Sequence, residues 1–212
     1  MTDHAHIFRP AKGDDPRTLV LFHGTGGDET SFFGLGEAIA PTAAVLSLRG
    51  DVNENGMLRF FRRTGEGIYD MEDLAIRTAA MADFVRRTLA TAGRDPSAAI
   101  GVGYSNGANI LANMLFTAPD VMRNAILMHP LIPFDPAPQP GLKDARILVT
   151  AGDRDPICPA ALSDRLEDWL ARQGAHVDRL RHAGGHELRP EEVSAAKAWA
   201  AGFGNGTAQT AA

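Results

Sequence analysis

Short apolar runs alternate with longer amphipathic segments along the chain, as they do in successive β-α units. The apolar runs predict strands at residues 18–24, 43–50, 98–103, 124–129, 146–152 and 176–181. Apolar residues spaced three or four apart, together with proline, glycine and capping signals, predict helices at residues 71–92, 106–117, 159–173 and 190–203. The near-continuous Val, Ile and Leu content of the strands indicates an α/β fold, with a mostly parallel central sheet and helices on both faces.

The length of 212 residues suits one well-filled domain, which we place at residues 18–203. Residues 1–17 are interpreted as an N-terminal extension and residues 204–212 as a flexible C-terminal tail. No internal repeat is found. In sheets of this kind, binding sites form at the carboxyl ends of the strands, and every candidate residue considered below follows such a strand end.

Composition and charge narrow the class of partner. The net charge of -5 at pH 7 gives no reason to expect nucleic acid, and no apolar run reaches the ~20 residues that span a bilayer. The N-terminal segment is polar and lacks the apolar core of a signal peptide. Cys158 is the single cysteine, which suits a reducing compartment, so we expect a cytoplasmic protein.

A glycine-flanked serine follows the predicted strand 98–103. GYSNG at residues 103–107 matches G-x-S-x-G, a motif that places the serine Oγ on a sharp strand-to-helix turn, where it projects into a site. Glycine is so frequent here that roughly six in a hundred such chains would carry the motif by chance. Its place between a predicted strand and a predicted helix favours Ser105 as a nucleophile over an ordinary β-turn-α junction.

A serine nucleophile needs a base, and the base needs an orienting carboxylate, in the chain order serine, acid, histidine. Two histidines follow the last predicted strand. His186 is favoured as the base because its glycine-flanked loop can reach across the sheet, whereas His182 at the strand end is interpreted as a packed or exposed residue. His23 and His129 also end strands but precede the acid, so a structural role is expected for both, with His23 supporting the loop that follows it.

The segment AGDRDPICP offers two acids, Asp153 and Asp155. Asp153 directly follows Gly152 and could simply form a turn. Asp155 lies before Pro156 and further from the strand, nearer the histidine loop. The spacing favours Asp155 only slightly and leaves both open. Glu187, the neighbour of the favoured histidine, is expected to face solvent.

The glycine-rich loop HGTGGDE at residues 23–29 is expected to complete an oxyanion hole. The residue after the nucleophile supplies one backbone N–H and such a loop supplies the second, so the amides of Asn106 and Thr25 are the predicted pair. The loop contains no lysine and neither P-loop nor G-x-G-x-x-G spacing. We therefore exclude nucleotide binding there.

The irregular stretch 51–69 is longer than loops that merely connect two elements in a compact domain. Arg59, Arg62 and Arg63 interleave with Phe60 and Phe61. The stretch is either a flap that brings an arginine to an acidic group of the substrate, or a solvated loop that one phenylalanine anchors. Both interpretations stay open. The proline-rich loop 130–141 is expected to form another wall of the site.

Cysteine and metal chemistry are not expected. Cys158 lacks a glycine elbow and is interpreted as a packed small apolar residue. Histidine, aspartate and glutamate do not cluster at metal-ligand spacings in the sequence, so no metal site and no cofactor are predicted.

With these motifs in view, residues 18–203 resemble the bacterial phospholipase/carboxylesterase family of α/β-hydrolases, which is related to acyl-protein thioesterases and dienelactone hydrolases. The resemblance rests on HGTGGDE, LRGDVNENGMLRFFRR, GYSNGAN, AGDRDPICP and GGH. It implies the α/β-hydrolase fold. The family's G-x-x-D-P element implies Asp155 rather than Asp153 as the acid, its G-G-H element implies His186 as the base, and its oxyanion residue after His-Gly corresponds to Thr25.

The chain also departs from its relatives. Dienelactone hydrolases carry cysteine where this chain has Ser105, so lactone opening is not implied. Thioesterases of the family often carry glutamine where this chain has Asn106, which leaves protein deacylation in doubt. We expect a serine carboxylesterase that hydrolyses small carboxylic esters through an acyl-enzyme. The alternatives are a thioesterase or lysophospholipase with the same triad, and a non-catalytic relative that binds a small ligand. Whether the chain forms a homodimer is left open.

Overall fold

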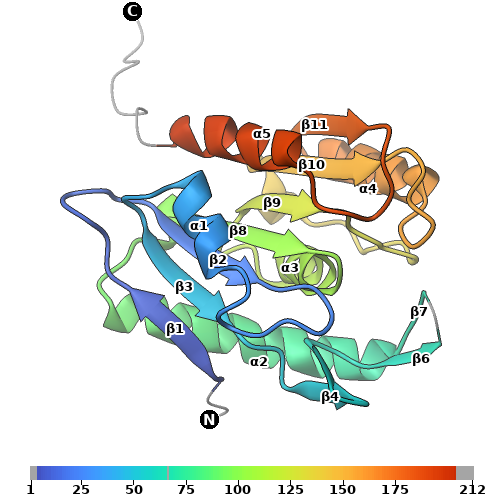
Figure 1. The fold of residues 1–212 in the computed structure, drawn as a ribbon, viewed down its shortest axis with the longest axis horizontal. Helices are drawn as coiled ribbons and strands as arrows, with labels where there is room; N and C mark the ends of the chain where they lie inside the picture. Colours follow the sequence, from blue (N-terminus) through green and yellow to red (C-terminus); the bar gives the residue numbers. More distant parts are fainter. Residues whose placement is uncertain (1–3, 66, 204–212) are drawn as a thin grey trace, which may run out of the picture.

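The computed structural model describes residues 4–65 and 67–203 and contains a seven-stranded central sheet, shown in Figure 1. The strand order is β1-β3-β2-β8-β9-β10-β11, and every pair is parallel except β1 with β3. The strands are β1 (His6–Arg9), β2 (Thr18–Phe22), β3 (Ala44–Leu48), β8 (Ala99–Tyr104), β9 (Asn124–Met128), β10 (Arg146–Gly152) and β11 (His176–His182). This arrangement confirms the predicted mostly parallel sheet.

Helices cover both faces of the sheet. The helices are α1 (Phe33–Ile39), α2 (Met71–Thr91), α3 (Asn106–Thr117), α4 (Ala160–Arg172) and α5 (Pro190–Ala201), with short 3-10 turns at Pro96–Ala98 and Pro140–Leu142. α1 and α5 lie on one face, and α2, α3 and α4 lie on the other (Figure 1). The alternation of strand and helix therefore produces the three-layer arrangement expected of β-α units.

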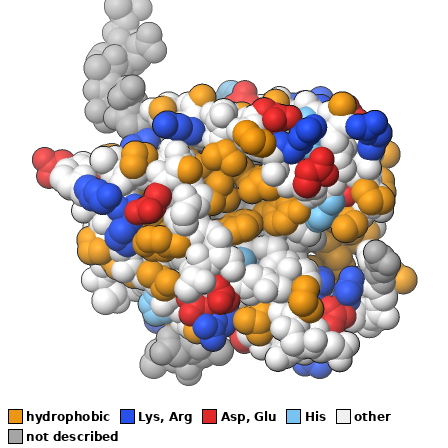
Figure 2. All heavy atoms as spheres, viewed as in Figure 1, with side chains coloured by type: hydrophobic (Ala, Val, Ile, Leu, Met, Phe, Trp, Pro, Cys, Tyr) orange, Lys and Arg blue, Asp and Glu red, His pale blue; other side chains and the backbone are white. Residues whose placement is uncertain are grey.

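Two apolar clusters, one on each face, hold the layers together. The strands of the sheet centre are fully buried along their length, as the near-continuous apolar runs predicted. α3 is buried almost all round, because it packs between the sheet and α2. On the opposite face, hydrophobic side chains gather over α1 and α5 (Figure 2), where partly buried residues include Phe32, Phe33, Leu35, Leu188 and Phe203.

The stretch that follows β3 forms two short antiparallel hairpins rather than an irregular loop. The first pairs β4 (Val52–Glu54) with β5 (Met57–Arg59), and the second pairs β6 (Arg63–Gly65) with β7 (Ile68–Tyr69). We call residues 51–69 the hairpin segment. Asp70 then caps α2, since its carboxylate accepts a hydrogen bond from the Asp73 amide at 3.0 Å. The hairpin segment is thus fixed at both ends to regular structure.

Most predicted elements agree with the structure to within one or two residues. α1, β1 and the four strands of the hairpin segment were not predicted. β1 lies in the stretch interpreted as an N-terminal extension, yet it pairs with β3 at the sheet edge. The predicted flexible tail at 204–212 lies outside the described residues. Within the described part of the chain, no helix is both long enough and apolar enough to cross a membrane.

Candidate active site

Ser105 lies on a sharp turn between β8 and α3, at the carboxyl edge of the sheet. Its backbone has φ 52° and ψ -119°, a strained conformation for a residue with a Cβ. The flanking glycines make the turn possible. A Cβ at Gly103 would lie 2.7 Å from the Gly107 carbonyl oxygen, and one at Gly107 would lie 2.2 Å from the Phe22 carbonyl oxygen. The G-x-S-x-G pattern therefore corresponds here to a nucleophile elbow.

The structure brings Ser105, His186 and Asp155 together, although 81 residues separate the first two and 31 the last two. His186 Nε2 lies 2.9 Å from Ser105 Oγ, and His186 Nδ1 lies 2.7 Å from Asp155 Oδ2. Each distance is that of a hydrogen bond. The three residues follow β8, β11 and β10, so the parallel sheet itself gathers them at one edge.

Two contacts hold the loop that carries His186. The Tyr104 hydroxyl donates a hydrogen bond to the His186 carbonyl oxygen, and the two rings lie 5.3 Å apart. The loop backbone also packs directly on β10, since a Cβ at Gly152 would lie 2.2 Å from the Gly185 carbonyl oxygen. Glycine at position 152 thus allows the histidine loop to approach the acid.

Asp155 is buried, and its carboxylate accepts hydrogen bonds on both oxygens. Oδ2 lies 2.7 Å from His186 Nδ1 and 2.8 Å from His129 Nδ1, while Oδ1 accepts from the amides of Ile157 at 2.8 Å and Cys158 at 2.9 Å. Burial by itself raises the pKa of a carboxyl group, but these bonds outweigh it and lower the pKa of Asp155. The group is therefore ionised at neutral pH and can orient His186.

Behind Asp155 lies a buried polar network that the sequence analysis did not predict. His129 is fully buried, and its Nε2 lies 3.1 Å from Glu192 Oε1. The two atoms form an ion pair whose geometry does not meet that of a hydrogen bond. The Thr150 hydroxyl donates to the same oxygen at 2.6 Å, and His182 Nε2 lies 3.2 Å from Glu192 Oε2. The network thus continues from the candidate triad into α5.

The charge state of His129 follows from its neighbours. Burial by itself lowers the pKa of an imidazole, but the contacts with Glu192 and Asp155 outweigh burial and raise the pKa of His129. For Glu192, the penalty of burial is likewise outweighed by His129, Thr150 and the Arg189 amide, so its pKa is lowered. A cationic imidazole between two carboxylates is attracted to both, and the three groups together carry one net negative charge.

The same residues form two groups whose ligand atoms lie within 4.8 Å of one another: His129, Asp155 and His186, and His129, His182 and Glu192. The sequence spacing gave no sign of these clusters, because the fold assembles them from three separate elements. In the first group both imidazoles are hydrogen-bonded to Asp155, and in the second group the Nε2 atoms of His129 and His182 lie 3.1 and 3.2 Å from the carboxylate oxygens of Glu192. A metal ion would have to displace those pairs and the protons between them.

The predicted oxyanion pair lies beside Ser105. Thr25 and Asn106 both line the pocket at this edge of the sheet, with Ser105 and His186. Within residues 4–65 and 67–203, the Thr25 amide donates no hydrogen bond to backbone or side chain. The Asn106 amide is at the first position of α3, where backbone N–H groups have no partner inside the helix. The Ser105 amide, by contrast, donates to the Met128 carbonyl oxygen at 2.9 Å.

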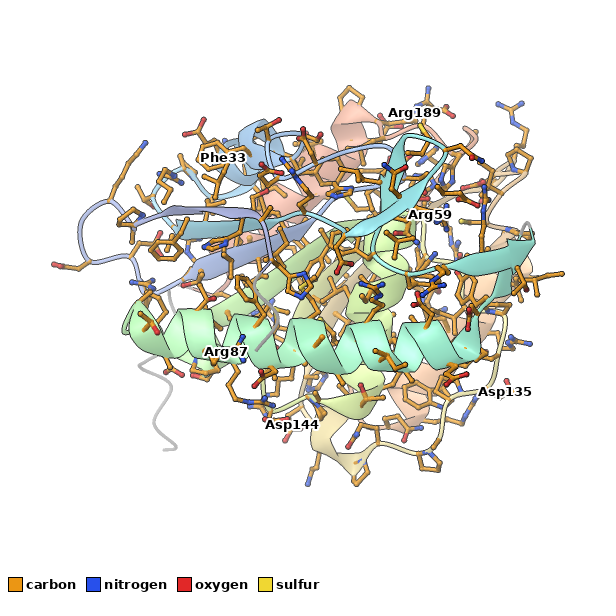
Figure 3. The ribbon with its side chains drawn as sticks, turned by 90° about the horizontal axis from the view of Figure 1, so that it is seen from below. Phe33, Arg59, Arg87, Asp135, Asp144 and Arg189 are labelled. Carbon is orange, nitrogen blue, oxygen red and sulfur yellow. The ribbon has the colours of Figure 1, made fainter. Side chains whose placement is uncertain are left out.

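The hairpin segment forms one wall of the pocket. It has arginines in the pocket, as expected of a flap, and buried phenylalanines, as expected of an anchored loop. Phe60 and Phe61 are buried and anchor it, and the Phe60 amide donates to Asn106 Oδ1 at 2.8 Å. Arg59 and Arg63 line the pocket, which has a volume of about 290 Å³. In Figure 3, Arg59 lies at the end of the molecule that carries the small hairpins. Arg62 instead points away from the pocket lining and pairs with an aspartate of α2.

The other candidates lie outside the triad geometry. The Asp153 amide donates to the His182 carbonyl oxygen, and among the described residues the Asp153 side chain forms no hydrogen bond or ion pair with either histidine. Glu187 is exposed and caps the Gly185 amide. Cys158 is buried, and burial raises the pKa of its thiol.

His23 does support its loop, as expected from the sequence. Its Nδ1 lies 2.7 Å from the Gly24 carbonyl oxygen, and its Nε2 accepts from the Gly50 amide at 3.0 Å. The first bond lies within the loop after β2, and the second ties that loop to the loop after β3. The proline-rich loop contributes one residue to the pocket, Leu131.

A serine elbow at the carboxyl edge of a mostly parallel sheet, with a histidine and an aspartate aligned behind it, defines an α/β-hydrolase. No protein-family model matches the chain. It is 40% identical over 194 residues to MhqD of Bacillus subtilis (strain 168), which is named as a hydrolase, and the alignment covers 92% of this chain and 96% of that one.

Solved structures agree with this relationship. A Bacillus cereus carboxylesterase superposes with a TM-score of 0.89 at 38% identity over 94% of each chain. A Mesorhizobium loti carboxylesterase superposes with a TM-score of 0.82 at 30% identity, covering 89% of this chain and 90% of that one. The chain belongs to the bacterial phospholipase/carboxylesterase family of α/β-hydrolases, and these relatives support ester hydrolysis as its activity.

Proposed function

We propose that the chain is a serine carboxylesterase that hydrolyses small carboxylic esters through an acyl-enzyme. The observation that carries the proposal is the continuous hydrogen-bonded path from Ser105 Oγ through both ring nitrogens of His186 to Asp155 Oδ2, with distances of 2.9 and 2.7 Å. A buried, ionised carboxylate at the end of this path keeps Nδ1 protonated, so that Nε2 is free to accept the serine proton.

The first step is acyl transfer to the enzyme. Ser105 Oγ attacks the ester carbonyl carbon while its proton passes to His186 Nε2. The negative charge on the carbonyl oxygen is met by the amides of Thr25 and Asn106, aided by the N-terminal end of α3. The carbon–oxygen bond to the alcohol then breaks, and His186 Nε2 returns the proton to the leaving oxygen.

The second step is deacylation. Water gives a proton to His186 Nε2 and attacks the acyl carbon, the bond to Ser105 Oγ breaks, and the serine takes the proton back. One ester and one water yield one carboxylic acid and one alcohol. The enzyme returns to its starting protonation state, so the reaction needs no cofactor.

The size of the pocket favours small esters. About 290 Å³ lies at the lower limit of typical small-molecule sites and accommodates a short acyl chain. A thioesterase or a lysophospholipase could use the same three residues, because the enzymes differ in the leaving group. Initial rates with p-nitrophenyl esters of increasing acyl length and with acyl-CoA thioesters separate these activities, and we expect the highest kcat/KM for short oxygen esters.

A fluorophosphonate probe tests the serine mechanism directly. We expect stoichiometric labelling of the wild-type protein at Ser105, and neither labelling nor p-nitrophenyl acetate turnover in Ser105→Ala. The alternative is a non-catalytic relative that binds a small ligand. Absence of labelling in a folded wild-type protein, or labelling that survives Ser105→Ala, would establish that alternative or another nucleophile.

A further inference from the structure

Two arginines of the hairpin segment face the same pocket as Ser105. Arg59 ends β5 and is only 6% exposed, and Arg63 begins β6 with a side chain that is 36% exposed. Both line the pocket together with Thr25 and His186. Positive charge is therefore placed next to the point where the ester carbonyl would lie.

The Arg59 guanidinium is buried but incompletely paired. Its Nη1 donates to Thr25 Oγ1 at 2.8 Å, and its Nε donates to the Phe61 carbonyl oxygen at the long distance of 3.4 Å and lies 3.5 Å from Glu54 Oε2. Its Nη2 has no hydrogen-bond partner among the residues that the structure describes. Nη2 is not one of the fully buried atoms that lack a partner, so it is accessible from the pocket and can donate to an anionic group of a substrate.

The charges around the pocket do not balance within the described residues. Glu54 is the carboxylate within ion-pair distance of either arginine, and Arg63 Nε already lies 3.0 and 3.2 Å from its two oxygens. One carboxylate thus serves two guanidinium groups. Burial is the main cause that lowers the pKa of Arg59, and the charge of Arg63 adds to it, while Glu54 and Tyr69 raise the pKa by less.

Among the described residues, Arg59, Arg63 and Glu54 together carry one positive charge, which a carboxylate would neutralise. A phosphate monoester, with nearly two negative charges at neutral pH, would reverse the imbalance instead. The planar guanidinium also matches a planar carboxylate, because two parallel N–H donors can meet its two oxygens. The chemistry of the pocket therefore favours a carboxylate over a phosphate.

We propose that Arg59 and Arg63 form an anion subsite, and that the preferred substrates are small esters carrying a free carboxylate a few bonds from the scissile carbonyl, such as half-esters of dicarboxylic acids. This inference rests on the proposed ester hydrolysis at Ser105 for its reaction, but the binding of the carboxylate does not depend on it. Arg59 also donates a hydrogen bond to the side chain of Thr25, in the loop that supplies the proposed oxyanion amide. The same guanidinium would therefore contact both this loop and a bound carboxylate.

Two esters with four-carbon acyl groups test the preference. Monoethyl succinate carries a carboxylate where ethyl butyrate carries a methyl group, and released ethanol reports hydrolysis of both. We expect kcat/KM for monoethyl succinate to exceed that for ethyl butyrate by about ten-fold or more, a difference that one charge-assisted contact supplies. In Arg59→Met the ratio falls to about one, and in Arg59→Lys, which keeps the charge, it is partly retained.

Arg62→Met is the matched control. Arg62 lies between Phe61 and Arg63 in the chain, but its side chain is 62% exposed, pairs with Asp73 and does not line the pocket. We expect its ratio to equal that of the wild-type protein. An equal loss in Arg62→Met and Arg59→Met would mean that general surface charge attracts the anion, and would overturn the subsite.

A binding measurement separates this inference from the proposed function. By calorimetry, Ser105→Ala is expected to bind succinate, and Ser105→Ala/Arg59→Met to bind it at least about ten-fold more weakly. Succinate binding without hydrolysis of either ester by the wild-type protein would refute the esterase and retain the subsite. Hydrolysis of ethyl butyrate with no succinate binding and no preference would refute the subsite and retain the esterase. Inorganic phosphate that binds more tightly than succinate would refute the carboxylate assignment.

Discussion

His129 Nδ1 lies 2.8 Å from Asp155 Oδ2, and both side chains are completely buried. The acid of the candidate triad therefore has two histidine partners, one that faces the nucleophile and one that faces the interior. The second partner balances a charge that would otherwise stand unpaired in the core whenever the first is neutral. Two predictions concern this network.

Replacing His129 should destabilise the fold strongly. In His129→Gln, the carboxylates of Asp155 and Glu192 lose the cation between them, and breaking a buried ion pair on one side typically costs about 3–5 kcal/mol. Urea denaturation at pH 6 measures the free energy of unfolding. The control is His176→Gln, because His176 is exposed at the start of β11 and should change stability by less than about 0.5 kcal/mol. Equal effects in the two variants would contradict a charged network.

The stability difference between wild type and His129→Gln should depend on pH. The raised pKa of His129 means that its contribution is fully present below the unfolded value of about 6.5 and is lost as the pH rises through the folded value. The lowered pKa values of Asp155 and Glu192 make their contribution present above about pH 4.5 and lost as the pH falls through the folded values. The difference should therefore be largest between about pH 4.5 and 6.5. A difference that stays constant to pH 9 would indicate a neutral His129.

The two acids of the β10 loop should differ sharply in their effect on turnover. Asp155→Asn removes the charge that orients His186, and substitutions of this kind lower kcat by about 10³–10⁴-fold. Asp153→Asn should leave kcat within about two-fold, because the Asp153 carboxylate forms no hydrogen bond or ion pair with the described histidines of the site. Steady-state kinetics with p-nitrophenyl acetate decides between them. A larger loss in Asp153→Asn than in Asp155→Asn would show that Asp153, and not Asp155, is the acid of the site.

Gly152→Ala should impair activity through the histidine loop. The new Cβ would lie 2.2 Å from the Gly185 carbonyl oxygen, and backbone must move to relieve the contact. A displacement of about 1 Å at His186 lowers kcat on the order of 10²-fold. Gly34→Ala in α1 is the control, because a Cβ there meets nothing within 4 Å and should stabilise the helix by about 0.5–1 kcal/mol. Full activity in Gly152→Ala would show that the loop tolerates the shift.

The sequence predicted the central layers of the fold because buried parallel strands are apolar throughout. It did not predict α1, whose seven residues include Gly34 and Gly36, both of which disfavour helix in isolation. Nor did it predict β1, because a four-residue edge strand with polar flanks gives too short an alternation to recognise. Tertiary pairing with β3, not local propensity, determines that strand.

The candidate site was predicted where a local motif marks it, as for Ser105 and His186. A structural role was expected for His129, but its contacts with Asp155 and Glu192 were not predicted, because nothing local marks them. His129 precedes the acid in the chain, and Glu192 lies in the first turn of α5, where an acidic residue already has an ordinary explanation at a helix start. Their meeting depends on the packing of α5 against β10. Only the assembled fold reveals that contact.

The positive φ at Ser105 makes the residue that suits the proposed activity differ from the residue that would be most stable at this position. A conformation of this kind costs on the order of 1–3 kcal/mol in a residue with a Cβ, and Ser105→Ala would retain that strain. Ser105→Gly would relieve it and should unfold at a higher temperature than Ser105→Ala, although both lack the nucleophile. A stability screen alone would therefore replace Ser105 with glycine, whereas the proposed nucleophilic role accounts for a serine at this position.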